Sequence, residues 1–312
     1  MTLNRSEGLT NLYYRLKPAI PWPVRLALRR FLARIVRRQF KSSWPIDEPS
    51  GRAPDGWPGW PDGKEFAFVL THDVEGRRGL ERCRGLAEME MDLEFRSSFN
   101  FVPEGEYLTP EPLRAFLGEH GFEVAVHDLH HDGKLYRSWK TFKNAAPKIN
   151  RYLAAWGAVG FRSGFMLHNL RWLQTLNILY DASTFDTDPF EPQPDGVNTI
   201  FPFWVPGGDR AGYVELPCTL PQDFTLFVLL RETAIDVWKS KLDWVAAHGG
   251  LALVNAHPDY MNFGGRRTSS EYAAGLYTGF LEYVARRYRS TGWFALPRDV
   301  ATYVCQHAAG RR

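Results

Sequence analysis

Two acidic residues, Asp73 and Glu75, follow the apolar run of residues 66–70 after Thr71 and His72. A continuous apolar run of strand length predicts a strand buried on both faces, as in a parallel sheet covered by helices. The carboxyl ends of such strands are where open α/β sheets and barrels place their active sites. Asp73 could instead cap the following helix while Glu75 stays in water, because aspartate favours helix N-caps for purely structural reasons.

A pair of histidines supplies partners for these acids. His127 and His131 are four residues apart and follow the predicted strand 122–126. One helical turn could aim both imidazoles at a single point, and the same spacing holds zinc in the helical H-E-x-x-H pattern. With Glu75 as third ligand, the set has the composition of a catalytic metal site with open positions. Two separate structural histidines are the alternative, but a pair at a strand end opposite two acids favours the metal site.

Other polar residues also follow predicted strands. Arg162 comes after the fourth strand, Asp181 and Asp186 lie in or after the fifth, and His257 follows residues 251–256. Polar groups gathered at the same end of successive parallel strands are how barrels build active sites. We therefore expect these side chains to meet the acids and the histidine pair.

The elements that must position these residues alternate between strand and helix. About seven or eight such units predict an α/β fold, a distorted (β/α) barrel with an N-terminal basic helical extension. Residues 186–211 are rich in Pro and Gly, and a loop of that length is typical of a binding groove. The predicted strands are 66–75, 97–102, 122–126, 158–161, 180–185, 212–216, 251–256 and 293–296, and the predicted helices are 77–94, 110–120, 136–156, 170–179, 233–248 and 272–289.

Composition limits the class and the partners. The chain has 312 residues, and its three cysteines are odd in number and match no metal spacing, so a reducing compartment is favoured over a disulfide scaffold. Residues 1–50 carry ten Lys or Arg against three acids, so the +3 net charge leaves the remaining residues at −4. A mildly acidic main domain argues against nucleic-acid binding. No run is long enough to span a bilayer and no secretory signal is recognisable, so we predict a cytoplasmic protein.

The basic charge is concentrated in an N-terminal extension, residues 1–50. Residues 24–41 have the pattern of an amphipathic helix, with an apolar stripe among arginines, which Pro21 and Pro23 precede. We favour a helix that docks this stripe on the main domain and shows its arginines to water; peripheral contact of residues 22–41 with an anionic membrane, at its inner face, is the alternative. Residues 51–63, rich in Pro, Gly and Trp, are predicted to link the extension to a catalytic barrel of residues 64–305. The stripe consists of Val24, Leu28, Phe31, Leu32, Ile35 and Val36.

The ordered set of motifs resembles the polysaccharide deacetylases of the NodB-homology type, carbohydrate esterase family 4. The resemblance covers roughly residues 64–300, and it departs from the family pattern at the first motif, where the second acid is Glu rather than Asp, as in a divergent D-x-E branch. Residues 1–50 lie outside it. The five motifs are residues 71–75 (THDVE), 127–131 (HDLHH), 162–165 (RSGF), Asp181 within 180–183 (YDAS), and 253–258 (LVNAHP).

The resemblance implies a metal-dependent hydrolase that removes an acyl group, an N-acetyl group above all, from a sugar or a lipid-linked glycan precursor. It implies a divalent metal ion, most often Zn²⁺, held by Glu75, His127 and His131. Asp73 would be the general base and His257 the general acid, with Arg162 paired to Asp73 and Asp181 orienting His257. The candidate substrate-binding residues are Phe165, Phe190, Trp204 and Tyr260.

Two other functions compete with this one. A small non-sugar amide could be the substrate, as in allantoinase-like relatives, although Phe190, Phe203 and Trp204 favour a larger ligand. A non-catalytic carbohydrate-binding relative would keep the fold, but the intact set of acids and histidines argues against it. His72, where the family has Phe, is expected to be a packed or hydrogen-bonded residue, and Asp128 could reach the metal or a neighbouring histidine.

Overall fold

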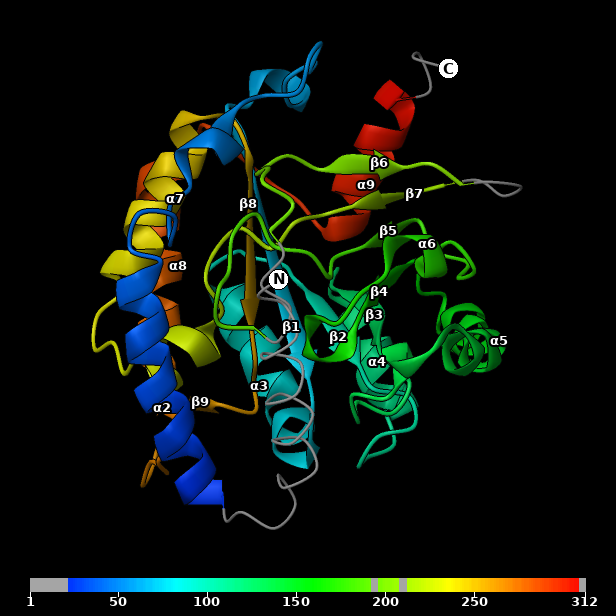
Figure 1. Cartoon of the computed structure of the whole chain (residues 1–312), viewed down its shortest axis with the longest axis horizontal. Coiled ribbons are helices and arrows are strands. Elements are labelled where there is room, and N and C mark those ends of the chain that lie inside the picture. Colours follow the sequence, from blue (N-terminus) through cyan, green and yellow to red (C-terminus); the bar gives the residue numbers. More distant parts are fainter. Residues whose placement is uncertain (1–21, 192–195, 208–211, 309–312) are drawn as a thin grey trace, which may run out of the picture.

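A curled sheet of parallel strands forms the centre of the computed structural model, which describes residues 22–191, 196–207 and 212–308 (Figure 1). The strand order is β11-β1-β2-β3-β4-β5-β7-β6, and β8 also pairs with β1. Neighbouring strands run parallel, except that β6 is antiparallel to β7. The predicted distorted (β/α) barrel is thus confirmed. The strands are β1 (Phe66–Val74), β2 (Ser98–Phe101), β3 (Glu123–His127), β4 (Gly160–Arg162), β5 (Tyr180–Asp181), β6 (Phe203–Val205), β7 (Tyr213–Glu215), β8 (Leu251–Ala256) and β11 (Gly292–Phe294).

Strand β1 is central because both of its faces are covered. Phe66, Phe68 and Leu70 belong to one core cluster, whereas Ala67 and Val69 belong to another. Alternate residues of a strand point to opposite faces, so an unbroken apolar run is what a strand between two packed layers requires. All nine residues of β1 are buried, including the polar ones at its carboxyl end.

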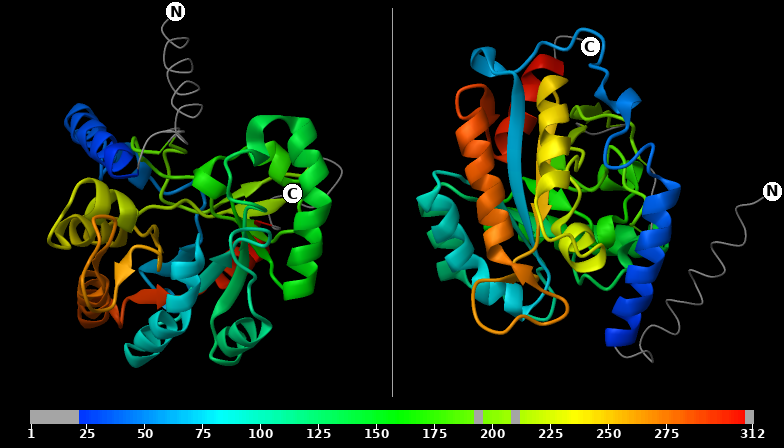
Figure 2. Two further views of the ribbon diagram at one scale, coloured as in Figure 1. Left: turned by 90° about the horizontal axis from the view of Figure 1, so that it is seen from below. Right: turned by 90° about the vertical axis from the view of Figure 1, so that its left-hand side faces the viewer.

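Helices surround the sheet, with α7 and α8 on one side and α5 on the other (Figures 1 and 2). The residues at the two ends of the long helix α5 explain where this helix begins and ends. Its N-cap Ser138 accepts a hydrogen bond from the Thr141 N–H, and Gly157 ends it in the left-handed conformation at φ 62°. The helices are α2 (Trp22–Gln39), α3 (Arg77–Asp92), α4 (Glu111–Glu119), α5 (Trp139–Trp156), α6 (Leu170–Leu173), α7 (Asp236–Ala247), α8 (Ala274–Tyr288) and α9 (Pro297–Ala308).

Several elements differ from the sequence prediction. Helix α6 is a single turn and not a helix over 170–179. The predicted loop 186–211 contains the edge strand β6. Three features were not predicted: the helix α9, the π-helical segment η6 (Phe224–Leu229), and the short parallel pair β9 (Met261–Asn262) and β10 (Tyr272–Ala273).

The N-terminal helix α2 packs on η6, but with the opposite face from the predicted one. Leu26 and Ala33 are buried, whereas most of the predicted apolar stripe is exposed. Trp44 and Trp60, from the stretch between α2 and β1, are buried in the core. Within the described residues, no helix has the length and apolar character needed to cross a membrane. Residues 1–21 of the predicted extension lie outside the described residues.

Candidate active site

Glu75, His127 and His131 form a compact group of ligand atoms at the carboxyl end of the sheet. Glu75 follows β1, His127 ends β3, and His131 lies in the next loop. One ligand atom from each lies within 4.8 Å of the others. The structure thus brings together the three residues predicted to hold a metal.

The hydrogen bonding of the His127 imidazole fits a ligand of a divalent cation. The Nδ1 of His127 lies 3.1 Å from the Arg162 carbonyl oxygen, which can only accept, so Nδ1 carries the proton. This leaves the lone pair on His127 Nε2, which is buried without a hydrogen-bond partner, while the buried His131 Nε2 lies 3.2 Å from Glu75 Oε1. A buried polar atom without a hydrogen-bond partner costs free energy, so His127 Nε2 is suited to bind a ligand. In metal sites, a hydrogen bond from the other ring nitrogen, as His127 Nδ1 makes here, orients the imidazole.

A loop, not a helical turn, brings the two imidazoles together. Asp128 and His131 both have left-handed backbone conformations, at φ 58° and 52°, and the two histidine ring centroids lie 4.8 Å apart. Phe165 stacks on His131 with ring centroids 4.5 Å apart. Gly164 permits this close approach, because a Cβ there would lie 2.4 Å from Asp128 Oδ2. The prediction of a helical turn at residues 127–131 is therefore wrong, although the spacing correctly identified the pair.

Asp73 is a buried carboxylate beside this group. The side-chain amides of Asn100 and Asn255 donate to its two oxygens, each at 2.8 Å. The predicted ion pair with Arg162 is present, with Nε 3.7 Å from Oδ1. Burial alone would raise the pKa of Asp73, but the charges of two neighbouring histidines and of Arg162 outweigh it and hold the pKa below its ordinary value. Asp73 is thus held as a carboxylate.

His257 faces the same two acids from the end of β8. Its Nε2 lies 3.9 Å from Asp73 Oδ2 and 3.9 Å from Glu75 Oε1. Its Nδ1 lies 2.6 Å from Asp223 Oδ1, and its backbone N–H donates to Asp223 Oδ2 at 2.8 Å. Burial lowers the pKa of His257, but Asp223 above all and the two site acids raise it to about 10.

Asp223, and not Asp181, therefore orients His257. Asp181 instead accepts hydrogen bonds from the backbone and hydroxyl of Ser183, at 3.0 and 2.8 Å. Burial and the neighbouring Glu215 carboxyl raise the pKa of Asp181 well above its ordinary value. The prediction that Asp181 orients the acid is wrong, because Asp181 lies in a buried carboxyl pair.

Three residues of the site were missed by sequence reasoning. Asn100 and Asn255 were detectable, because each is a polar residue near the carboxyl end of a predicted strand. Asp223 had no such signal, because no predicted strand precedes it. His72, by contrast, is hydrogen-bonded as expected, to the Ala256 carbonyl and to Glu90.

The four candidate substrate-binding residues divide into two pairs. Phe165 stacks on His131, and the Tyr260 hydroxyl donates to Glu75 Oε2 at 2.7 Å, so both lie at the site. Phe190 instead packs edge-on against Trp44, with centroids 4.8 Å apart. Trp204 lies in the antiparallel edge strand β6, next to α9, and packs with a core cluster. The contacts of Phe190 and Trp204 are thus with other aromatic and core residues, and their role in substrate binding stays a prediction.

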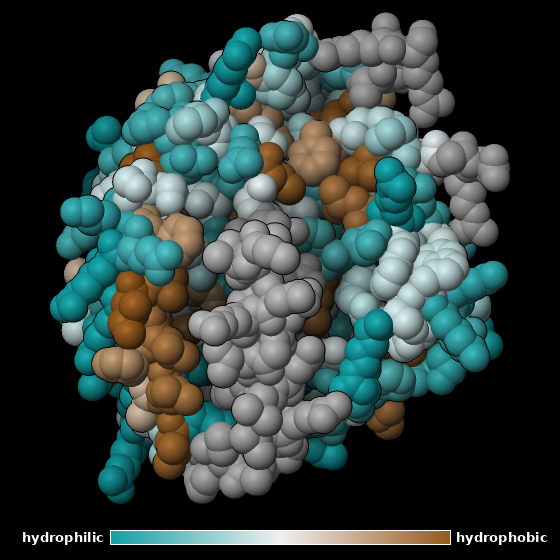
Figure 3. All heavy atoms as spheres, in the orientation of Figure 1, coloured by the Kyte–Doolittle hydropathy of each residue, from teal (hydrophilic) through white to brown (hydrophobic). Residues whose placement is uncertain are grey.

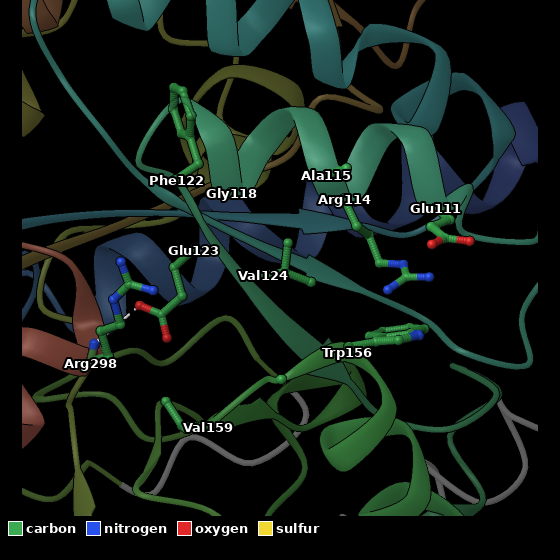
Figure 4. A pocket seen from close by; sticks show the side chains of 11 residues that line it. Glu111, Arg114, Ala115, Gly118, Phe122, Glu123, Val124, Trp156, Val159 and Arg298 are labelled. Atoms are coloured by element: carbon green, nitrogen blue, oxygen red, sulfur yellow. Dashed lines mark hydrogen bonds between the residues drawn. The ribbon is translucent and has the colours of Figure 1, made fainter.

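The opposite end of the sheet holds a pocket of about 400 Å³ without a comparable group (Figure 4). Glu123 begins β3 there and accepts a hydrogen bond from the Arg298 backbone N–H at 3.1 Å, while Arg114 lies over the Trp156 ring. Active sites of parallel sheets lie at the carboxyl ends of the strands. The group around Asp73 is therefore the candidate active site.

Comparisons with known proteins agree with this architecture. No protein-family model matches the sequence, and no curated protein matches it significantly. Among solved structures, a proposed polysaccharide deacetylase of Mycobacterium smegmatis superposes with a TM-score of 0.61 at 20% identity, over 82% of this chain and 96% of that one.

Two other structures are similar at lower scores. A peptidoglycan deacetylase of Bacillus subtilis has a TM-score of 0.44 at 10% identity, over 81% of this chain and 96% of that one. A mutant of a carbohydrate esterase family 4 pseudoenzyme with restored activity has a TM-score of 0.44 at 15% identity, over 78% of this chain and 69% of that one. The likeness to the mycobacterial structure, together with the strand order, shows that this chain has the NodB-type fold of the polysaccharide deacetylases.

Proposed function

We propose that this chain is a metal-dependent hydrolase that removes an acyl group, an N-acetyl group above all, from a sugar or a lipid-linked glycan precursor. The observation that carries the proposal is the ligand group of Glu75, His127 and His131, in which two buried imidazole Nε2 atoms face the carboxylates of Asp73 and Glu75. The carboxylate Asp73 and the imidazole of His257 lie beside it. The fold shared with the mycobacterial structure adds support.

A divalent metal suits this donor set, and Zn²⁺ is the first choice because two imidazoles and one carboxylate are a common catalytic zinc set. When bound, the metal would supply Lewis acidity to the acyl carbonyl and lower the pKa of a water molecule.

Asp73 would accept the proton of the attacking water as the new carbon–oxygen bond forms. Asn100 and Asn255 each donate to one of its oxygens, so the carboxylate cannot rotate away from the site. Arg162 and the neighbouring imidazoles favour its charged form.

His257 would deliver a proton to the leaving nitrogen as the carbon–nitrogen bond breaks. Its Nε2 faces the acids, while Nδ1 is held by Asp223. Asp223 is held in turn by the Tyr272 hydroxyl, at 2.9 Å. A carboxylate that fixes the orientation of an imidazole in this way is the arrangement that general acid–base catalysis requires.

A small non-sugar amide is a second candidate substrate. The case for a large ligand depended on three aromatic residues of the predicted loop, and two of these, Phe203 and Trp204, lie in the edge strand β6. This finding weakens the argument for a large substrate. The catalytic groups would be the same for a sugar and for a small amide.

Acyl release by the metal-loaded full chain tests both candidates. The panel contains N-acetylglucosamine oligomers, nucleotide-linked N-acetyl sugars and small cyclic amides. Asp73→Asn and His131→Ala are expected to abolish turnover. His130→Ala is the matched control, because this neighbouring histidine is exposed and contacts Glu104 rather than the ligand group.

Each outcome selects one function. Acetate released from a sugar by wild type and His130→Ala, and lost in the other two variants, supports the proposal. Turnover of the cyclic amides alone selects the second candidate. No turnover of any substrate, with no metal retained by the wild type, selects a non-catalytic binding protein.

A further inference from the structure

One face of α2 is fixed to the rest of the protein largely by its arginines. Arg30 donates to the Val228 carbonyl at 2.9 Å and to the Ser269 carbonyl at 2.5 Å. Arg37 forms an ion pair with Glu232 in the chain segment after η6. The guanidinium of Arg29 lies 4.8 Å from the centre of the Phe224 ring. These contacts fix which side of the helix faces outward.

The opposite face of α2 exposes large apolar side chains (Figure 3). Of the eight large apolar side chains that the described residues expose, five lie on this helix. At about 100° per residue, four of them fall within an arc of about 60°, which makes a continuous ridge. We call these five residues the apolar ridge; their exposed fractions are Val24 58%, Leu28 44%, Phe31 59%, Leu32 49% and Ile35 46%.

Cations flank the apolar ridge. Arg34, Arg38 and Lys41 are exposed, and the two arginines lie beside the ridge on one side of the helix. Residues 22–41 contain seven Lys or Arg and no acid. An apolar ridge with a purely cationic border is complementary to a surface that is apolar inside and anionic at its edge.

We propose that α2 docks this protein on an anionic membrane surface, with the apolar ridge inserted at the level of the lipid headgroups. Partial burial of Phe31 and Ile35 would supply the apolar contribution. Each arginine near an anionic surface would add about 1 kcal/mol, which is about a fivefold gain in binding. The inference does not depend on which reaction the protein catalyses.

The loop that follows β9 packs against the inward-facing side of α2. It contacts α2 through the hydrogen bond from Arg30 to Ser269, and it exposes Phe263, Arg266 and Arg267. A segment packed against α2 therefore exposes one more apolar side chain and two more cations.

The docking helix also contacts the wall of the candidate active site. Arg29 lies over Phe224, and the Phe224 and Tyr260 rings are 4.7 Å apart. Tyr260 in turn donates to Glu75. Three consecutive side-chain contacts therefore connect α2 to a residue of the ligand group.

Vesicle flotation of the full chain tests the proposal. The vesicles are phosphatidylcholine with and without phosphatidylglycerol, and the variants are Phe31→Ser with Ile35→Ser, and Arg34→Gln with Arg38→Gln. We expect wild type to float with the anionic vesicles only. The apolar double variant should lose about tenfold or more in binding, because it replaces two of the five apolar side chains of the ridge with polar ones. The arginine double variant should lose about 25-fold at low salt, and much less at high salt.

Leu108→Ser is the matched control, because Leu108 is 85% exposed and lies far from α2 in the sequence. It should float like wild type, and thermal unfolding should show that all variants remain folded. Wild type that stays unbound with both vesicle types overturns the proposal, and so does equal flotation of the apolar double variant. If sedimentation shows a dimer that this variant abolishes, and wild type does not float, a second copy of the chain covers the ridge instead.

Discussion

Asp73 at the carboxyl end of β1 and Glu123 at the amino end of β3 are both buried carboxyl groups of one sheet, but their pKa values move in opposite directions. Asp73 has cationic neighbours that outweigh burial and keep its pKa low. Around Glu123, burial outweighs the Tyr180 hydroxyl, the Arg298 backbone N–H and the Arg298 charge, and raises the pKa to about 7.

The difference shows that burial alone does not make a catalytic carboxylate. A buried acid stays charged only where nearby cations and several donors compensate for lost hydration. The carboxyl end of this sheet provides that compensation, and it also leaves the buried Nε2 of His127 without a hydrogen-bond partner. The amino end provides little compensation, so its acid is a structural residue. The predictions below test this contrast.

The largest expected effect is on metal binding. His127→Ala removes one of three ligands, and its affinity for Zn²⁺ should fall about 1000-fold, because even the loss of an outer hydrogen-bond partner costs about 10–100-fold. Isothermal titration calorimetry measures the change. Glu123→Gln, at the other end of the sheet, should bind metal like wild type; a similar loss in both variants would contradict the contrast.

Asp223→Asn should lower kcat by about 100- to 1000-fold without loss of bound metal. The amide keeps the shape of the side chain but presents no charge to His257 Nδ1, so the orientation and charge of the imidazole are both impaired. Turnover and metal content are measured on the same sample. Asp181→Asn is the comparison, since Asp181 has no contact with His257; a larger loss of kcat there would restore the original prediction.

Glu123 should make stability depend on pH. Its pKa rises from 4.5 to about 7 on folding, so the folded state holds the proton more tightly than the unfolded state does. The stabilisation is full below about pH 4.5 and is lost as the pH rises through about 7, to a total of about 3 kcal/mol at most.

Urea unfolding of wild type and Glu123→Gln at about pH 5 and about pH 8 measures this dependence. The free energy of unfolding of Glu123→Gln should change less between these two pH values than that of wild type. The neutral amide resembles the protonated carboxyl that wild type holds at about pH 5, so the two proteins should be most similar in stability at that pH. Parallel profiles for the two proteins would show that Glu123 is charged in the folded state.

The parts of the site that lie at strand ends could be predicted from the sequence. The apolar run before Asp73 and Glu75 identified a strand covered on both faces, and parallel pairing brings the ends of β1, β3 and β8 together. His127 and His257 therefore lie near the acids as expected. This inference needs only the pattern of apolar and polar residues along each strand and the direction of the strands.

Contacts made outside strand ends could not be predicted. Asp223 reaches His257 across 34 residues, from a segment without a strand pattern. The amphipathic pattern of α2 showed that the helix has two faces, but not which face docks. Arginine side chains can bind backbone carbonyls and aromatic rings, so a basic face can pack inward as Arg29 and Arg30 do.

The smallest effect should separate two of the four aromatic residues that the sequence placed in the substrate site. Phe165→Ala removes the ring that stacks on His131 and should lower kcat/KM about tenfold, because a misplaced ligand imidazole weakens positioning of the reacting groups. Trp204→Ala should change kcat/KM by no more than about twofold, since β6 lies at the sheet edge beside α9. Trp204 packs with a core cluster, so its loss should appear as a lower unfolding temperature instead. Steady-state kinetics and thermal unfolding of both variants measure the two effects, and a loss of kcat/KM in Trp204→Ala without a change in stability would return Trp204 to the substrate site.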